Sequence, residues 1–278
     1  MRAWLTGGLA AAMIAPTVAF GAPRLEIKAA AARVTIIPEA RADIHVDIIQ
    51  SRRALPLRLV RSGGVTVVDG GLARRVRGCP RLADGTLGVR VRGLGNLSPA
   101  ELPRLVVRTP LDARVTVGDG VSGDVDRAAS LEFENRGCGD WTIANVRGRL
   151  RLDQLGSGTA KTGRAGQAVL NVAGGGEIEM GPVGGPVTAI STGEGTIVVA
   201  SVDGPVIARV AGSGGIEIAG GRASELNAQV AGSGSILFDG EAGAVAANVM
   251  GPGVVRVARA LGPVSRRVFG AGRVQIGP

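Results

Sequence analysis

Apolar and polar residues alternate strictly over much of the chain. Two clear stretches are Val206-Ile-Ala-Arg-Val-Ala-Gly-Ser-Gly-Gly-Ile-Glu-Ile218 and Leu226-Asn-Ala-Gln-Val-Ala-Gly-Ser-Gly-Ser-Ile-Leu-Phe238. Apolar side chains fall at positions i, i+2 and i+4, which is the period of a β-strand with one buried face and not that of a helix. Turn residues such as Gly220-Gly221 and Asp239-Gly240 close these stretches, so the chain is predicted to be all-β.

A Gly-x-Gly motif marks each repeat. Its copies begin at residues 137, 156, 174, 193, 212, 232, 251 and 270, in steps of 18 to 20 residues, with a degenerate copy at 118/120. Such a unit is shorter than a propeller blade or a helical-pair repeat, and it becomes stable only by stacking on its neighbours. We predict a single-stranded parallel β-solenoid over residues 118–278 with about 19 residues per coil. Because no six-residue subperiod is visible, a right-handed β-helix is preferred.

Stacking places equivalent residues of successive coils above one another. The expected inward ladders are Ile197, Ile216, Ile236, Val255 and Val274, and the small positions Ala189, Ala208, Ala228 and Ala247. Two residues before the first glycine, later coils have Val or Ser, whereas early coils have Asn135 and Gln154. These amides either hydrogen-bond to each other inside the solenoid or face solvent. Arg266 and Arg267 in the last coil indicate a protected strand edge, although an imperfect cap would permit end-to-end association.

The N-terminal region, residues 23–117, alternates without the repeat spacing. It is predicted to be an irregular β cap or a small β domain, with a hairpin turn at Ser62-Gly63-Gly64. The expected strands are Arg33–Ile37, Asp43–Ile49, Leu57–Val60, Val65–Asp69, Leu87–Arg92, Arg104–Thr109 and Arg114–Gly118.

Residues 1–22 have the pattern of a signal peptide: Arg2, a short uncharged apolar stretch and then small residues. No later segment approaches 18 uninterrupted apolar residues, so no transmembrane segment is expected in the mature chain. The protein is therefore predicted to be exported, to the periplasm or to the cell surface. Cys79 and Cys138 are the two cysteines of the chain, and in an oxidising compartment they are expected to form a disulfide.

Positive charge is concentrated in the N-terminal third. Residues 22–117 hold 17 Lys and Arg against 8 Asp and Glu, whereas residues 118–278 hold 14 against 15. An exported basic surface is expected to meet anionic envelope polymers or lipid headgroups; nucleic acid is disfavoured by compartment and by the scarcity of aromatic residues. A solvated basic face without a ligand is an equally good interpretation. The candidate interaction patch comprises Arg52, Arg53, Arg58, Arg61, Arg74, Arg75, Arg77 and Arg81.

Residues able to support catalysis are sparse. Asp43, His45 and Asp47 would share one strand face, which suits a metal or acid–base chemistry, but exposed polar alternation explains them better. The pairs Glu132/Glu134 and Glu177/Glu179 lie on outward faces without an obvious partner. The recurring Asp of calcium-binding β-solenoids is missing. We therefore predict no catalytic, cofactor or metal site and no enzymatic activity.

Residues from about 130 to 276, with Ala-Gly-Ser-Gly at 211–214 and 231–234, resemble the GIN-domain family of "putative autotransporter adhesin head" proteins. The Gly-Cys-Gly-Asp-Trp-Thr segment at 137–142 is similar to bacterial members. The resemblance implies an exported β-solenoid with a conjectured role in adhesion, and it assigns no functional residue. The sequence departs from the family motif at Gly215 and Ser235, where Asp is common.

Three functions compete on this basis. The first is a non-enzymatic envelope protein of adhesin-like or polymer-binding type. The second is a polysaccharide-active β-helix enzyme, which is favoured by fold analogy alone. The third is a self-assembling structural filament, suggested by the regular coils and the weak end cap.

Overall fold

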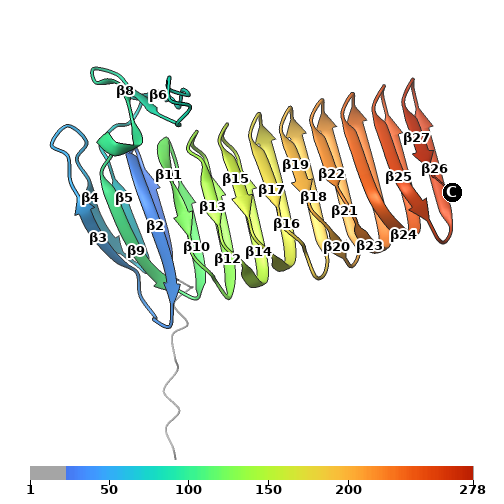
Figure 1. Cartoon of the computed structure of the whole chain (residues 1–278), viewed down its shortest axis with the longest axis horizontal. Helices are drawn as coiled ribbons and strands as arrows, with labels where there is room; N and C mark the ends of the chain where they lie inside the picture. The colour runs from blue at the N-terminus through green and yellow to red at the C-terminus, as the bar shows by residue number, and fades with distance from the viewer. Residues whose placement is uncertain (1–22, 278) are drawn as a thin grey trace, which may run out of the picture.

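The protein is a rod of stacked β coils (Figure 1). The computed structural model describes residues 23–277, so the predicted signal peptide at residues 1–22 lies outside the described residues. Nearly all strands belong to one 24-stranded sheet whose repeat strands pair in parallel. The predicted all-β parallel solenoid is confirmed.

The coils form two main ladders of parallel strands. The first ladder comprises β10 (Asp112–Val117), β12 (Ser130–Asn135), β14 (Val146–Gln154), β16 (Ala165–Gly174), β18 (Val187–Gly193), β21 (Val206–Gly212), β23 (Gly221–Gly232) and β26 (Val264–Phe269). The second ladder comprises β11 (Gly120–Val125), β13 (Trp141–Ile143), β15 (Thr159–Thr162), β17 (Glu177–Met180), β19 (Thr196–Val199), β22 (Gly215–Ile218), β25 (Val254–Ala260) and β27 (Arg273–Ile276). β24 (Ser235–Met250) runs through both ladders, and β20 (Val202–Asp203) lies on a third side.

The strand register follows the repeat in the sequence. Val187 pairs with Val206, which in turn pairs with Leu226, and the glycines of successive motifs pair as well. The predicted ladder is buried from Ile197 to Val255, as are the four alanines that keep the interior narrow, whereas Val274 in the last coil is only partly buried. Side chains at equivalent positions therefore touch along the axis, which is how a short unit acquires a core.

Asn135 and Gln154 point into the solenoid, so the inward interpretation of these amides is confirmed. Both side chains are fully buried. Asn135 Nδ2 donates to Gln154 Oε1 (3.1 Å) and to the carbonyl of Gly139 (3.0 Å), while Gln154 Nε2 donates to the carbonyl of Gly158 (2.8 Å). The backbone N–H of Gly137 donates to Asn135 Oδ1 at 3.0 Å. The two amides thus satisfy each other and the motif turns, as buried polar groups require.

The N-terminal region continues the solenoid in an order that differs from the chain order. Its strands are β1 (Arg24–Lys28), β2 (Ala31–Glu39), β3 (His45–Gln50), β4 (Arg58–Ser62), β5 (Val65–Asp69) and β9 (Arg104–Pro110). β1 lies between β5 and β10, and β2 lies between β9 and β11, all in parallel. The strands on either side of the boundary predicted at residue 117 therefore pair in one continuous sheet.

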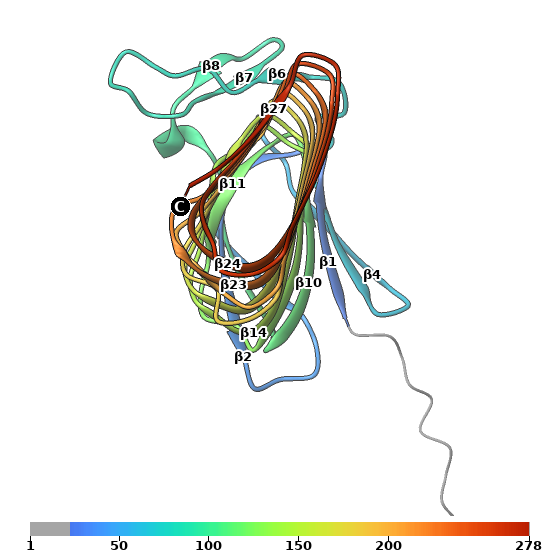
Figure 2. The same cartoon turned by 90° about the vertical axis from the view of Figure 1, so that its right-hand side faces the viewer.

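Two antiparallel strands cover the N-terminal end of the rod. β3 pairs with β9, and β4 pairs with β5 through the predicted turn at Gly63-Gly64, where both residues have positive φ (56° and 80°). Because antiparallel neighbours interrupt the parallel stacking, β3 and β4 end the coil series on this side (Figures 1 and 2). At the other end every residue of β26 is exposed, and Arg266 occupies the inward position above Ala247.

The predicted strand Leu87–Arg92 is wrong in extent. Only β7 (Val89–Val91) forms, between β6 (Val76–Gly78) and β8 (Gly95–Leu97), in a separate three-stranded sheet. A 3₁₀ turn, η1 (Pro99–Glu101), returns the chain to β9. This excursion extends from the side of the rod (Figure 2).

Candidate anion-binding surface

Residues 71–97 form an arginine-rich projection, which we call the arginine arm. Its antiparallel strands bring together six arginines that are all exposed: Arg74, Arg75, Arg77, Arg81, Arg90 and Arg92. The same segment contains a single carboxylate, Asp84. The arm therefore holds a strong local excess of positive charge.

The arm is fixed to the solenoid by packing and by a covalent bond. Leu72, Val89 and Val91 are buried in a small cluster with Ala31 of β2 and Leu102. At Gly120 an added Cβ would lie 2.4 Å from the Cγ1 atom of Val89, so this glycine allows the arm to approach the first residue of β11. The predicted disulfide Cys79–Cys138 is confirmed, with the two Cα atoms 5.6 Å apart. It ties the arm to the motif turn before β13.

The arginines of the arm are not neutralised by the protein. Among residues 23–277, none of the ion pairs includes an arginine of the arm. Arg75 donates to the backbone carbonyl of Arg92 (3.1 Å) and Arg90 to Asn96 Oδ1 (2.9 Å), which are neutral acceptors. Hydrogen bonds from the Thr86 hydroxyl and backbone N–H lower the pKa of Asp84 and hold this carboxylate in its own turn.

The eight arginines predicted as one patch fall into two groups. Arg74, Arg75, Arg77 and Arg81 belong to the arm, whereas Arg52, Arg53, Arg58 and Arg61 lie on β4 and the segment before it. The figures place β4 and the arm on different sides of the N-terminal end (Figures 1 and 2). Arg90 and Arg92 were missed, although their alternation with the buried Val89 and Val91 is a visible signal of outward-facing side chains.

Of the residues Asp43, His45 and Asp47, which the sequence places on one strand face, the structure brings His45 and Asp47 into contact. His45 Nε2 is 2.9 Å from Asp47 Oδ1, and Arg108 also pairs with Asp47, whereas Asp43 pairs with Arg41. Desolvation raises the pKa of Asp47, but hydrogen bonds and the positive charges of His45 and Arg108 outweigh this effect, so the pKa of Asp47 is lowered overall. Among the residues with described positions, no cluster of three His, Cys, Asp or Glu side chains suits a metal ion.

The expectation that the glutamate pairs lack partners is wrong for three of the four residues. Glu132 pairs with Arg114 (3.1 Å), Glu134 with Arg136 (2.6 Å) and Glu179 with Lys161 (2.9 Å). Arg114 and Lys161 come from the preceding coil. Stacking therefore creates cross-coil pairs that linear inspection does not reveal.

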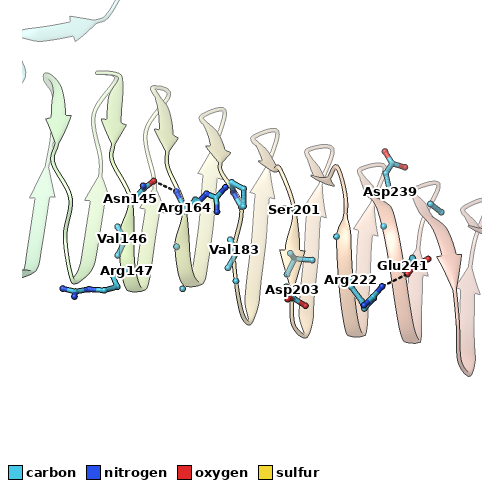
Figure 3. Close-up of a pocket in the computed structure, with 18 of the residues that line it drawn as sticks. Asn145, Val146, Arg147, Arg164, Val183, Ser201, Asp203, Arg222, Asp239 and Glu241 are labelled. Atoms are coloured by element: carbon cyan, nitrogen blue, oxygen red, sulfur yellow. Dashed lines mark hydrogen bonds and ion pairs between the residues drawn. The ribbon is translucent and has the colours of Figure 1, made fainter.

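A shallow groove of about 940 Å³ runs along the third side of the solenoid, beside β20 (Figure 3). Its floor includes Gly166 and Gly184, and an added Cβ at Gly184 would meet nothing within 4 Å. Two of its carboxylates are held in ion pairs: Glu241 with Arg222 and Arg259 (both 3.4 Å), and Asp239 with Arg256 (3.0 Å). The third carboxylate that lines the groove, Asp203, takes part in none of the ion pairs found among residues 23–277.

Comparison with known proteins gives a likeness in fold. No family model matches the chain, and no curated protein matches it. The chain is similar to the crystal structure of a "putative lipid binding protein" from Parabacteroides distasonis, with 16% identity, a TM-score of 0.49, and coverage of 94% of this chain and 95% of that chain. This degree of likeness does not extend to function. In the described chain, no helix has the length and apolar character needed to cross a membrane.

Proposed function

We propose that the protein is an exported, non-enzymatic, adhesin-like component of the cell envelope that binds an anionic envelope polymer through the arginine arm. The observation that carries this proposal is the set of six exposed arginines, with Asp84 as the one carboxylate of the same segment, on an arm anchored to the rod. A guanidinium group binds carboxylate, sulfate and phosphate groups in a bidentate manner. An ordered cluster of such groups suits a polymer that repeats acidic groups.

Export is supported by two independent features. The pattern of residues 1–22 is that of a secretion signal, and the disulfide Cys79–Cys138 is of a kind that persists in oxidising compartments. The periplasm and the cell surface both satisfy these requirements. The resemblance of the repeat to GIN-domain proteins supports the same assignment.

The non-enzymatic assignment is supported by the state of the groove. A polysaccharide-active enzyme needs a carboxyl group free to transfer a proton, commonly beside an aromatic sugar platform. Asp239 and Glu241 form ion pairs with arginines, so among the described residues Asp203 is the one carboxylate lining the groove outside an ion pair, whereas glycoside hydrolysis uses two carboxyl groups. The described tryptophan, Trp141, is buried in the core against Phe133.

The test is an isothermal titration: a soluble acidic polysaccharide is added to the mature chain, residues 23–278, at low and at high salt, and calorimetry measures the binding. Charge reversal of the arm by Arg74→Glu, Arg75→Glu and Arg77→Glu is expected to weaken binding about a hundredfold, since each arginine near an anionic surface contributes about 1 kcal/mol. The matched control reverses Arg209, Arg266 and Arg267, which are exposed on the solenoid, and it changes the net charge equally. Equal losses in both variants, or no binding by the native chain, would overturn the proposal.

A further inference from the structure

The N-terminal end of the rod combines exposed apolar side chains with arginines. We call it the N-terminal face; it consists of Ile48, Ile49, Arg52, Arg53, Arg58, Leu59, Val60 and Arg61. Ile49 exposes 64% of its surface and Val60 exposes 54%. No Asp or Glu occurs from residue 48 to residue 68. Within this stretch the charged side chains are all arginines, and the nearest carboxylate in the strand pairing is Asp69, opposite Arg58.

The strand register explains why these apolar residues are exposed. Ile48 lies opposite Leu105 and Leu59 lies opposite Val68, and both partners are fully buried at the end of the core. Ile48 and Leu59 thus extend the core outward, where no further coil covers them. Ile49 stands where the pairing of β3 with β9 is irregular, and it turns towards solvent. Val60 lies opposite Val67, on the outward side of β5, so it also points away from the core at this end of the solenoid.

A second copy of the chain is a poor occupant for this face. Two N-terminal faces brought together would place like-charged arginines opposite each other, and residues 48–68 contribute no carboxylate to compensate them. In addition, the irregularity in β3 disfavours edge-to-edge pairing of strands. A soluble anionic polymer would satisfy the arginines but would leave Ile49 and Val60 in water.

An anionic bilayer satisfies both components of the face. Its phosphate groups complement the four arginines, and the boundary between headgroups and acyl chains accepts small apolar side chains. Arginine is suited to this position because its stem packs on apolar surface while its guanidinium group reaches the phosphates.

We propose that the N-terminal face docks on the surface of an anionic lipid bilayer, with Ile49 and Val60 at the headgroup boundary and Arg52, Arg53, Arg58 and Arg61 on lipid phosphates. This inference rests on the proposed function for its envelope location, but it uses different residues from the arginine arm. Because β3 and β4 lie at one end of the rod (Figure 1), docking would leave the C-terminal coils projecting away from the membrane.

The experiment measures co-sedimentation of the mature chain with vesicles of phosphatidylcholine, with and without phosphatidylglycerol. Ile49→Ser with Val60→Ser is expected to weaken binding to the anionic vesicles about tenfold, because two partly exposed apolar side chains no longer enter the bilayer boundary. The matched control, Ile207→Ser with Met250→Ser, changes exposed apolar residues on the side of the solenoid and is expected to bind as the native chain does. Thermal melts of both variants verify that the fold is intact.

A titration with soluble acidic polysaccharide separates this inference from the proposed function. The Ile49/Val60 variant should bind the polymer as the native chain does, whereas the variant with Arg74, Arg75 and Arg77 changed to Glu should bind the polymer much more weakly. If the native chain binds the polymer but not the anionic vesicles, docking fails and the proposed function stands. If the Ile49/Val60 variant binds vesicles as tightly as the control, docking is overturned. Docking would also be overturned if Phe269→Ser, at the opposite end of the rod, abolished vesicle binding and the Ile49/Val60 variant did not.

Discussion

At the scale of single residues, the motif glycines are required by the stacking of one coil on the next. Gly212 has φ of +129°, and a Cβ there would lie 2.4 Å from the carbonyl oxygen of Gly193 in the preceding coil. Side chains larger than hydrogen therefore conflict with both the backbone conformation and the neighbouring coil. The Gly-x-Gly motif therefore recurs because the backbones of successive coils are in close contact at this position.

Gly212→Ala is expected to lower the free energy of unfolding by about 2–3 kcal/mol, because alanine strains the positive φ and contacts backbone that cannot move away alone. Chemical denaturation followed by circular dichroism measures this change. Gly184→Ala is the matched control, since its Cβ meets nothing within 4 Å, and its effect should stay within about 0.5 kcal/mol. Equal effects at the two positions would contradict this explanation of the motif.

At the scale of elements, the arginine arm depends on anchors outside itself. Its three strands have three residues each, which is too little for independent stability. The buried cluster with Ala31 and Leu102 supplies part of the missing stability. The disulfide closes a sequence separation of 59 residues and restricts the arm in the unfolded chain.

Replacing Cys79 and Cys138 together by serine should loosen the arm while the solenoid persists. Loss of the disulfide is expected to remove about 2–4 kcal/mol of stabilisation, so trypsin should cleave after the arm arginines much faster than in the native chain. Mass spectrometry of the early fragments identifies the cleaved sites, and cleavage after Arg209 in β21 serves as the internal control. Unchanged cleavage of the arm would show that packing alone holds it.

At the scale of the whole molecule, the two ends differ from the middle. Central coils bury every inward position, as with Leu170, Ile178, Ala189 and Ile197. The last strand of the first ladder, β26, is exposed throughout, and β4 is exposed along its whole length at the other end. Because each coil contacts only its neighbours, stability should fall towards the ends.

Amide hydrogen exchange of the native chain should show this gradient directly. Amides of β26 and β4 are expected to exchange at least about a hundredfold faster than those of β16 to β19. The reason is that local opening of an end strand breaks few apolar contacts and therefore costs little free energy. Exchange followed by mass spectrometry of peptides resolves the coils. Uniform protection along the rod would indicate that the ends are covered in solution, as a self-assembling filament would require.

The sequence by itself determined the repeat and its consequences. The spacing of the Gly-x-Gly motifs, the alternation of apolar residues and the ladders at Ile197 and Ala208 are periodic, and periodicity in sequence becomes neighbourhood in space when coils stack in register. The Cys79–Cys138 pairing followed from the count of two cysteines in a chain that is predicted to be exported.

Only the tertiary structure decided the arrangement of the N-terminal third. The insertion of β1 and β2 between β5/β9 and β10/β11 joins strands about 90 residues apart, as in the pairing of Arg24 with Arg114. Aperiodic strands have no repeat to fix their partners, so alternation predicts their faces but not their neighbours. The same non-local pairing divided the predicted arginine patch between the arm and the N-terminal face. The number of arginines in a segment of sequence does not determine on which surface of the folded protein each arginine lies.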